Sequence, residues 1–173
     1  MNTYKINDNL DWLKEKLKLD SLVKNAEARF VKRGQVYLCH LGIGIGAEMQ
    51  NTRPCVILQN DRANYFAGNT VVAPFTHKEK DLPTIVPIDP VHDEKGEEML
   101  SGAVNLTQVR VISKARLGDH IATLDKGTMA KIDAALAREL DLMSYYNDLH
   151  KKYENLKKQL DTLKGAPHTR EHS

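Results

Sequence analysis

A series of short β-type segments, separated by turn residues, occupies the middle of the chain between Gly34 and Thr123. The apolar pattern predicts six strands: one directly after Gly34, then 55–59, 70–76, 84–88, 103–112 with an interruption after residue 106, and 120–123. Pro74 inside the third strand indicates an edge or a bulge. A long first loop and one helix after the last strand complete the order of a small antiparallel barrel. We therefore expect an α+β fold with helical extensions at both ends.

Residues 1–32 are predicted to form an N-terminal helical extension. Asn7, Asp8 or Asn9 is the expected N-cap of a first helix, whose apolar residues are Leu10, Trp12, Leu13 and Leu17. The apolar stripe changes phase near 19–21, which indicates a break. Asp20 or Ser21 is the expected cap of a second piece, whose apolar residues are Leu22, Val23, Ala26 and Phe30.

The C-terminal helix is predicted to begin at the cap Asp125 and to bury Met129, Ile132, Leu136 and Leu140. The apolar pattern continues beyond this helix with alternating spacings of four and three residues. The members of this seam are Leu142, Tyr146, Leu149, Tyr153, Leu156, Leu160 and Leu163. Two interpretations stay open: a seam of coiled-coil type, or an amphipathic helix that packs on the N-terminal helices of its own chain. We therefore divide the chain into an extension (1–32), a main domain (33–142), a heptad-patterned extension (143–164) and a disordered tail (165–173).

Composition narrows the classes of function. The net charge of the 173 residues is only +2, so a nucleic-acid-binding patch would have to be local. No apolar run is long enough to span a membrane and no secretory signal is recognisable, so the cytoplasm is the expected compartment. Cys39 and Cys55 are expected to be buried, reduced thiols. The acidic stretch 92–98 is interpreted as a solvated loop, and neither a metal site nor a cofactor is expected.

The stretch from Gly46 to Asp61 contains the candidate site. Three glycines at 42, 44 and 46 lack the spacing of a nucleotide-binding motif, and they indicate a flexible loop between two strands that is long enough to act as a lid. Arg53 follows this loop, and Pro54 is the expected first residue of the next strand. A guanidinium fixed at such a point is suited to phosphate or carboxylate; the alternative is a structural ion pair.

Five motifs in this part of the chain stand in a characteristic order: Arg33-Gly-Gln-Val-Tyr, Gly46-Ala-Glu with Thr52-Arg-Pro, Ile57-Leu-Gln-Asn-Asp61, Leu82-Pro-Thr, and Leu106-Thr-Gln-Val-Arg110. From about residue 33 to residue 142 the chain resembles the MazF/PemK toxin family. The resemblance implies an SH3-like barrel of the CcdB/MazF/PemK type and a homodimer. It also implies a sequence-specific endoribonuclease of the mRNA interferase class, which a cognate antitoxin protein inhibits.

By this resemblance Arg53 matches the family's catalytic arginine and Thr76 its catalytic threonine. RNA can be cleaved without a metal ion, because its own 2′-OH can attack the adjacent phosphate. The enzyme must then align the attack and stabilise charge in the transition state. Arg53 can donate two hydrogen bonds to phosphate oxygens, but it stays charged and is a poor general base.

The chain departs from one subtype of the family. PemK-type members carry a histidine in the first loop and an aspartate before the glutamine of the fifth strand, and here these positions are Ala47 and Thr107. An Arg/Thr arrangement is therefore favoured over a His/Asp mechanism. His40 and His77 lie nearby in the sequence, and a surface or core role is the preferred interpretation of both.

Polar residues along the groove are the predicted RNA contacts, because amides can read the edges of unpaired bases and cations can hold phosphates. The predicted set is Glu48, Gln50, Asn51, Thr52, Asn60, Asn64, Lys78, Gln108 and Arg110. Two alternatives use the same fold: a CcdB-like toxin that poisons DNA gyrase, and a non-catalytic RNA-binding module. The heptad extension beyond the C-terminal helix and the Arg53/Thr76 pair favour the ribonuclease.

Overall fold

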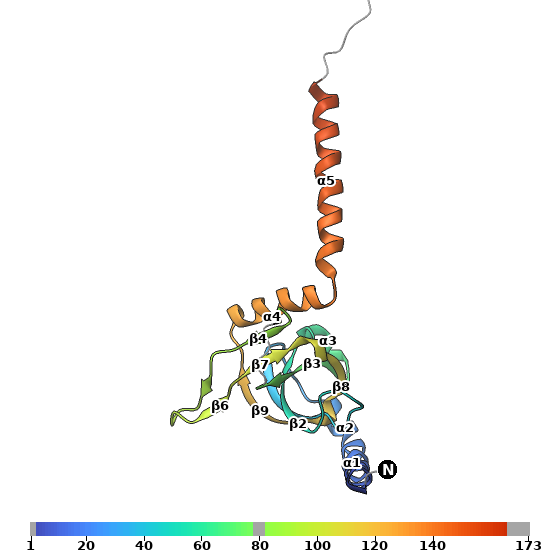
Figure 1. Ribbon diagram of the computed structural model, residues 1–173, viewed down its shortest axis with the longest axis vertical. Helices are drawn as coiled ribbons and strands as arrows, with labels where there is room; N and C mark the ends of the chain where they lie inside the picture. The colour runs from blue at the N-terminus through green and yellow to red at the C-terminus, as the bar shows by residue number, and fades with distance from the viewer. Residues whose placement is uncertain (1–2, 78–81, 166–173) are drawn as a thin grey trace, which may run out of the picture.

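The computed structural model describes residues 3–77 and 82–165. Figure 1 shows a curved sheet covered by one helix, with a second helix that projects away from it. The elements are α1 (Thr3–Ser21), α2 (Val23–Glu27), β1 (Gln35–His40), β2 (Thr52–Ile57), α3 (Asp61–Phe66), β3 (Asn69–Thr76), β4 (Ile85–Pro87), β5 (Val91–His92), β6 (Glu98–Leu100), β7 (Ala103–Asn105), η1 (Leu106–Gln108), β8 (Arg110–Ser113), η2 (Lys114–Arg116), β9 (Leu117–Thr123), α4 (Lys126–Glu139) and α5 (Leu142–Gly165).

All paired strands are antiparallel, which confirms the predicted α+β class. The main sheet has seven strands in the order β4-β7-β3-β2-β1-β9, and β8 joins it through β3. β3 is thus a central strand and not an edge. One of its sides pairs with β2, and the other changes partner from β8 to β7 between Val72 and Phe75. Pro74, which has no backbone N–H, lies at this change of partner.

Two apolar clusters hold the domain together. One includes Val56, Ala73 and Phe75 from the sheet with Ile132 and Ala135 from α4. The other consists of Val31, Tyr37, Cys39, Leu41, Cys55, Ile57, Val72, Ile112 and Leu117. Because alternate residues of β1, β2 and β3 enter different clusters, the two clusters lie on opposite faces of these strands. The predicted cap of α4 is confirmed: Asp125 accepts hydrogen bonds from the backbone N–H groups of Gly127 and Thr128.

Several strand boundaries differ from the prediction. β2 begins at Thr52, because pairing with β1 continues as far as His40, so Pro54 is its third residue and not its first. The acidic stretch expected to be irregular contains the β5–β6 hairpin. β9 begins at Leu117, three residues before the predicted start.

The N-terminal extension is less helical than predicted. α1 begins at Thr3, so Asn7, Asp8 and Asn9 lie inside this helix and not at its N-cap. The expected break is present after Ser21, but the cap of α2 is Leu22, without a side-chain hydrogen bond, in place of Asp20 or Ser21. α2 ends at Glu27, which leaves Phe30 outside any helix.

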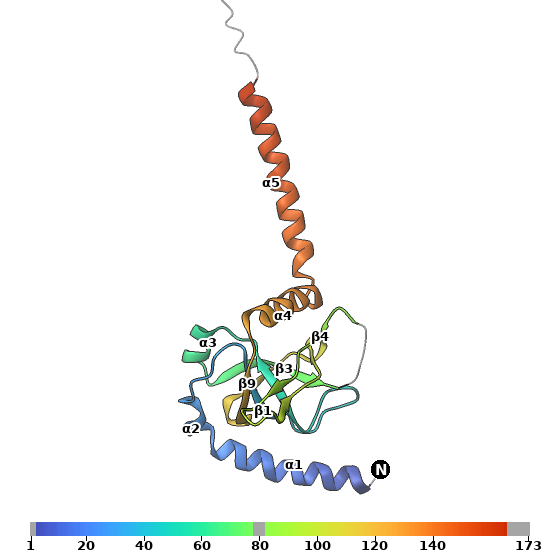
Figure 2. The same cartoon turned by 90° about the vertical axis from the view of Figure 1, so that its left-hand side faces the viewer.

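The C-terminal helix is interrupted, which the apolar pattern did not predict. Asp141 has a φ of 52°, and the chain turns there between α4 and α5. The Ser144 hydroxyl donates to the carbonyl and to the side chain of Asp141. Asp141 therefore ends α4 and also supports the start of α5. α5 and α1 lie at opposite ends of the molecule (Figures 1 and 2), which contradicts packing of α5 on the N-terminal helices.

α5 ends at Gly165, as the sequence indicates, and the predicted tail lies outside the described residues from 166 onward. Among the helices described, none combines the length and the apolar character needed to cross a membrane.

Candidate functional site

The register of β2 and β3 sets the two predicted catalytic residues opposite each other. Cys55 pairs with Pro74, and the pairing continues antiparallel along β2. Extending this register by two residues places Arg53 opposite Thr76. Residues directly opposite in an antiparallel pair share a face and lie within side-chain reach of each other. The topology therefore brings together two residues that are separated by more than twenty positions in the sequence.

The lid backbone orients Arg53. This half-buried side chain donates a hydrogen bond from Nε to the Gln50 carbonyl, 2.9 Å away. In the described part of the chain, no hydrogen bond occupies its two terminal nitrogens and no carboxylate forms an ion pair with it. The structural ion pair that was the alternative role for Arg53 is thus not found there. The guanidinium can offer two parallel donors to a phosphate.

Thr76 is held at the end of β3. The residue is only 7 % exposed and pairs with Ala103 of β7. Gly102, directly before β7, lies against the backbone of Thr76. Its φ is +98°, and a Cβ added to it would stand 2.6 Å from the Thr76 carbonyl oxygen. The same Cβ would approach Nδ1 of His77 to 3.1 Å. Because a side chain cannot fit there, Gly102 permits β7 to pack directly on the backbone of Thr76.

Positive charge gathers on this face around a buried thiol. The Cys55 thiol has a raised pKa, chiefly because of its hydrogen bond with Cys39 and its burial; Arg110 and Arg53 act in the opposite direction. Burial, together with the charge of Arg110, lowers the pKa of Arg116. Cys39 and Cys55 are both buried and free, as expected. The two cysteines are therefore inert core residues beneath a cluster of guanidinium groups.

The loop 41–51, which we call the lid, is hydrogen-bonded within itself. The Leu41 N–H donates to the Asn51 carbonyl and the Asn51 N–H to the Gly42 carbonyl, at 3.0 and 2.6 Å. Asn51 has a φ of 68°. The side chains of Glu48 and Gln50 accept hydrogen bonds from the backbone N–H groups of Ile45 and Gly44. These contacts give the predicted loop a defined shape.

Gln108 connects the lid to the sheet. Its Oε1 accepts a hydrogen bond from the Met49 N–H at 2.9 Å and another from Nη2 of Arg110 at 3.3 Å. Gln108 therefore positions both the lid and a cation, in addition to any contact of its amide nitrogen with a base.

A tryptophan from the N-terminal extension supports the other side of the lid, which sequence reasoning missed. A Cβ on Gly42 would stand 2.4 Å from the Trp12 ring, so the ring lies directly on the backbone. The Arg116 guanidinium lies 5.1 Å from the centre of the same ring and donates to the carbonyls of His40 and Leu41. The sequence contains no local motif that predicts the contact of Trp12 with Gly42 and Arg116, because Trp12 follows the ordinary spacing of an apolar helix face.

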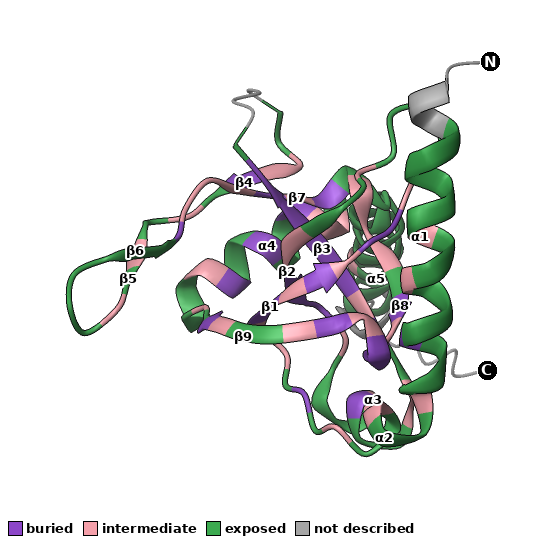
Figure 3. Ribbon diagram, turned by 90° about the horizontal axis from the view of Figure 1, so that it is seen from below, coloured by how far each residue is buried: buried purple, intermediate pink, exposed green. Residues whose placement is uncertain are grey.

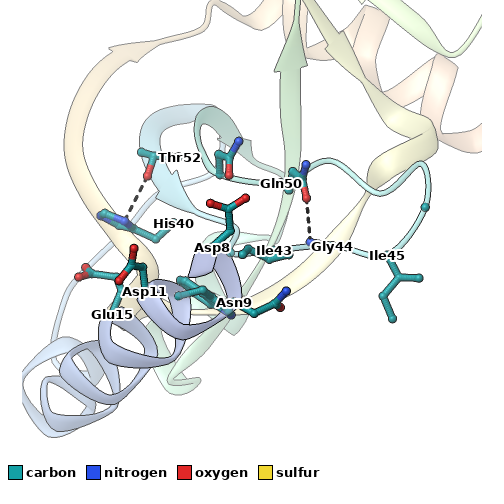
Figure 4. Close-up of a pocket in the computed structure, with 14 residues that line it drawn as sticks. Asp8, Asn9, Asp11, Glu15, His40, Ile43, Gly44, Ile45, Gln50 and Thr52 are labelled. Atoms are coloured by element: carbon teal, nitrogen blue, oxygen red, sulfur yellow. Dashed lines mark hydrogen bonds between the residues drawn. The ribbon is translucent and has the colours of Figure 1, made fainter. Parts of the chain in front are cut away.

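A pocket of about 790 Å³ opens between α1 and the lid. Figure 4 shows the carboxylates of Asp8, Asp11 and Glu15 directed into it from α1. On the opposite side lie Thr52 and His40, whose Oγ1 and Nδ1 are 3.2 Å apart. The predicted RNA contacts Gln50, Asn51 and Thr52 thus line a pocket that also has an acidic wall.

Other predicted site residues lie elsewhere. Asn60 follows the far end of β2 and caps α3 by accepting from the Ala63 N–H. Asn64 is fully buried, donates to the Gln59 carbonyl and accepts from the Thr70 hydroxyl. Burial takes the Asn64 side chain out of reach of a base, whereas Asn60 is exposed and uses only its Oδ1 for the cap. Lys78 lies outside the described residues.

The two positions that depart from the PemK subtype are also defined. Ala47 is exposed in the lid, and the hydroxyl of Thr107 in η1 donates to Oδ1 of Asn105, the N-cap of η1. In residues 3–77 and 82–165, no three His, Cys, Asp or Glu side chains gather closely enough to hold a metal ion.

Comparison with known proteins places these features in a family. Residues 32–140 match the family described as PemK-like, MazF-like toxins of type II toxin–antitoxin systems. The chain is similar to endoribonuclease EndoA of Bacillus subtilis, with 39 % identity over 117 residues, which cover 66 % of this chain and 98 % of the relative. It is also similar to endoribonuclease MazF of Staphylococcus epidermidis, with 32 % identity over 70 % of this chain and 98 % of the relative.

Solved structures share the fold. A mycobacterial endoribonuclease in complex with its cognate antitoxin has 32 % identity and a TM-score of 0.55, over 65 % of this chain and 96 % of that one. MazF from Deinococcus radiodurans has a TM-score of 0.56 at 21 % identity, over 65 % of this chain and 98 % of that one. The matched family region ends at residue 140, before α5 begins.

Proposed function

Because the chain belongs to the PemK-like, MazF-like toxin family of type II toxin–antitoxin systems, we propose that it is an endoribonuclease toxin that cleaves single-stranded RNA at a short sequence. The catalytic domain in this proposal is the segment 33–142. The observation that supports this site is the β2–β3 register: continued two residues beyond the Cys55–Pro74 pair, it sets Arg53 opposite Thr76, and the Arg53 guanidinium donates a hydrogen bond to the Gln50 carbonyl of the lid.

The proposed reaction needs no metal ion or external nucleophile. The 2′-hydroxyl gives up its proton as its oxygen forms a bond to phosphorus, the bond from phosphorus to the 5′-oxygen breaks, and the 5′-oxygen takes up a proton as it leaves, so the step has no net change in protons. The products are a 2′,3′-cyclic phosphate and a 5′-hydroxyl end. Arg53 donates to the non-bridging oxygens, where negative charge develops, and the Thr76 hydroxyl positions the 2′-OH or a phosphate oxygen.

The lid and η1 supply the remaining contacts in this proposal. The exposed side chains of Glu48, Gln50, Asn51 and Thr52 provide acceptors and donors for unpaired bases. Arg110 lies on the same face of the sheet as Arg53 and holds a flanking phosphate, while Gln108 keeps the lid and Arg110 in place.

The partners follow from the family. We propose that the chain acts as a homodimer in the cytoplasm and that a cognate antitoxin protein inhibits it. A mycobacterial relative has been solved in complex with its own cognate antitoxin, which supports this assignment.

The test is cleavage of a long RNA by the purified, antitoxin-free protein in EDTA, with the cut sites mapped by primer extension and the ends identified chemically. We expect cuts at one short sequence, each leaving a cyclic phosphate and a 5′-hydroxyl. Arg53→Ala should lower the cleavage rate by at least about 10²–10³-fold, because it removes donors to the developing charge. An unchanged circular dichroism spectrum would show that the variant keeps its fold.

Intact RNA after incubation with the wild-type protein would overturn the proposal. RNA that is bound but not cut would instead identify a binding module. Gyrase-dependent DNA breaks in cells with intact RNA would identify a CcdB-like poison.

A further inference from the structure

α5 carries an apolar seam that its own chain leaves uncovered. The helix stands clear of the barrel, and Figure 3 shows its surface as exposed. Six seam side chains are each between 48 and 65 % exposed: Leu142, Tyr146, Leu149, Tyr153, Leu156 and Leu160. They recur at alternating spacings of four and three, so they form one continuous stripe about 27 Å long. An isolated helix with such a stripe is stabilised when a second helix covers it.

The charges beside the seam argue against a second copy of α5 as this cover. In heptad terms the flanking positions are Met143, Tyr145, His150, Lys152, Lys157 and Gln159. In a parallel pair Lys152 of one chain faces Lys157 of the other. In an antiparallel pair the flank that contains Lys152 faces the same flank of the second chain, and likewise for the flank that contains Lys157. Among the described residues, neither flank contains an acid. Self-pairing would therefore leave Lys152 and Lys157 without an acidic partner across the contact.

The acidic residues of α5 point elsewhere. Asp148, Glu154 and Asp161 occupy the positions next to the outer face, beyond the flanks. The exposed apolar face of α1 does not complement the seam either, because the corresponding flanking positions are Lys14 and Lys16.

We propose that α5 is a docking helix for another protein, and that its partner is a helix with apolar residues at heptad spacing and acidic residues beside them. Leu149 and Leu156 at the centre of the seam pack between the partner's apolar side chains. Lys152 and Lys157 lie one on each side, where they pair with the partner's carboxylates and extend their apolar stems over the contact. The site lies outside the matched family region, so it is separate from the proposed RNA cleavage.

The probes are two synthetic peptides as long as α5, both with leucine at the seam positions. One has glutamate and the other lysine at every flanking position. Binding of each to the full-length protein is measured by fluorescence anisotropy at low and at high salt. We expect the acidic peptide to bind at least about tenfold more tightly than the basic one, and added salt to reduce the difference. Equal affinities, or no binding of the acidic peptide, would overturn the proposal.

Charge-reversed variants localise the effect. Lys152→Glu with Lys157→Glu should invert the preference, so that the basic peptide binds more tightly. Lys151→Glu with Lys158→Glu is the matched control, because it makes the same change of net charge on the outermost face of the helix. The control should leave the preference for the acidic peptide in place. A preference that survives the first pair of substitutions, or that the control inverts, would contradict the assignment of the flanks.

Two further outcomes would assign the seam to another occupant. Sedimentation velocity of the protein alone could reveal an assembly that Leu149→Gln with Leu156→Gln reduces in size, which would identify a second copy as the partner. Binding to phosphatidylglycerol vesicles that the same substitutions abolish would identify a membrane surface. Either result would overturn the proposal of an acidic partner helix.

Discussion

Gly102 is the residue at which the fold most directly determines the position of Thr76. Gly102→Ala would place a Cβ 2.6 Å from the Thr76 carbonyl oxygen, a distance that real Cβ atoms do not tolerate. The backbone there has a φ of +98°, which also strains any L-residue with a side chain. The obstructing atom belongs to β3 itself, so the clash cannot be relieved by rotation of a flexible side chain.

A matched control separates the destabilisation caused by the clash at Gly102 from the strain of a positive φ. Gly96→Ala introduces the same methyl group at a φ of +85°, where nothing lies within 4 Å of the added Cβ. It carries only the strain of positive φ, about 1–2 kcal/mol. Gly102→Ala carries a similar strain and an overpacking term of about 1–3 kcal/mol. The difference corresponds to a melting temperature roughly 2–12 °C lower than that of the control in a chain of this size.

Two assays test this reasoning on the same proteins. Thermal unfolding followed by circular dichroism gives the stability difference, and single-turnover cleavage of an RNA substrate gives the rate. A displacement of Thr76 by several tenths of an ångström should slow cleavage by about 10–100-fold in Gly102→Ala. Gly96→Ala should keep the wild-type rate, because Gly96 lies in the turn of the β5–β6 hairpin. Equal melting temperatures and equal rates for the two variants would refute the argument.

Two more predictions concern the elements around the barrel. Trp12→Ala should remove the contact of α1 with Gly42 and Arg116, so hydrogen exchange should show loss of protection in 3–21 while the barrel strands keep theirs; loss spread evenly over both would contradict this. The hydroxyl and the N–H of Thr128, followed by the N–H of Gly127, lower the pKa of Asp125. Its stabilising effect is therefore present above the unfolded pKa near 4 and is lost as the pH falls through the lower folded value. Asp125→Asn keeps a cap but should flatten the dependence of the melting temperature on pH below about 4. An unchanged slope would show that the Asp125 cap is not the source of this pH dependence.

Local chemistry explains what the sequence predicted well. Asp125 was predicted as a cap because a carboxylate at that point satisfies N–H groups only two and three residues away. β1 begins after Gly34 as expected, since a φ of +86° there requires glycine. The break after Ser21 follows the phase of the apolar residues. In each case the determining contact lies within a few residues.

Contacts between distant segments explain the differences. β2 begins at Thr52 because it pairs with His40, a partner that lies beyond a long loop. Asn64 looked like a polar residue of a surface loop, but Thr70 and the sheet bury it completely. The turn at Asp141 was hidden because the apolar spacing continues through it. For the site, the family motifs predict Arg53 and Thr76, and the β2–β3 register, continued two residues beyond the Cys55–Pro74 pair, sets them opposite each other.

The most direct test of that arrangement is a double-mutant cycle on single-turnover RNA cleavage with Arg53→Ala, Thr76→Ala and the combined variant. If the two side chains act on one phosphate as a unit, the double variant should be no slower than Arg53→Ala alone, within a factor of about three. Rate losses that multiply across the cycle would show two independent roles, and a wild-type rate in either single variant would contradict the proposed site.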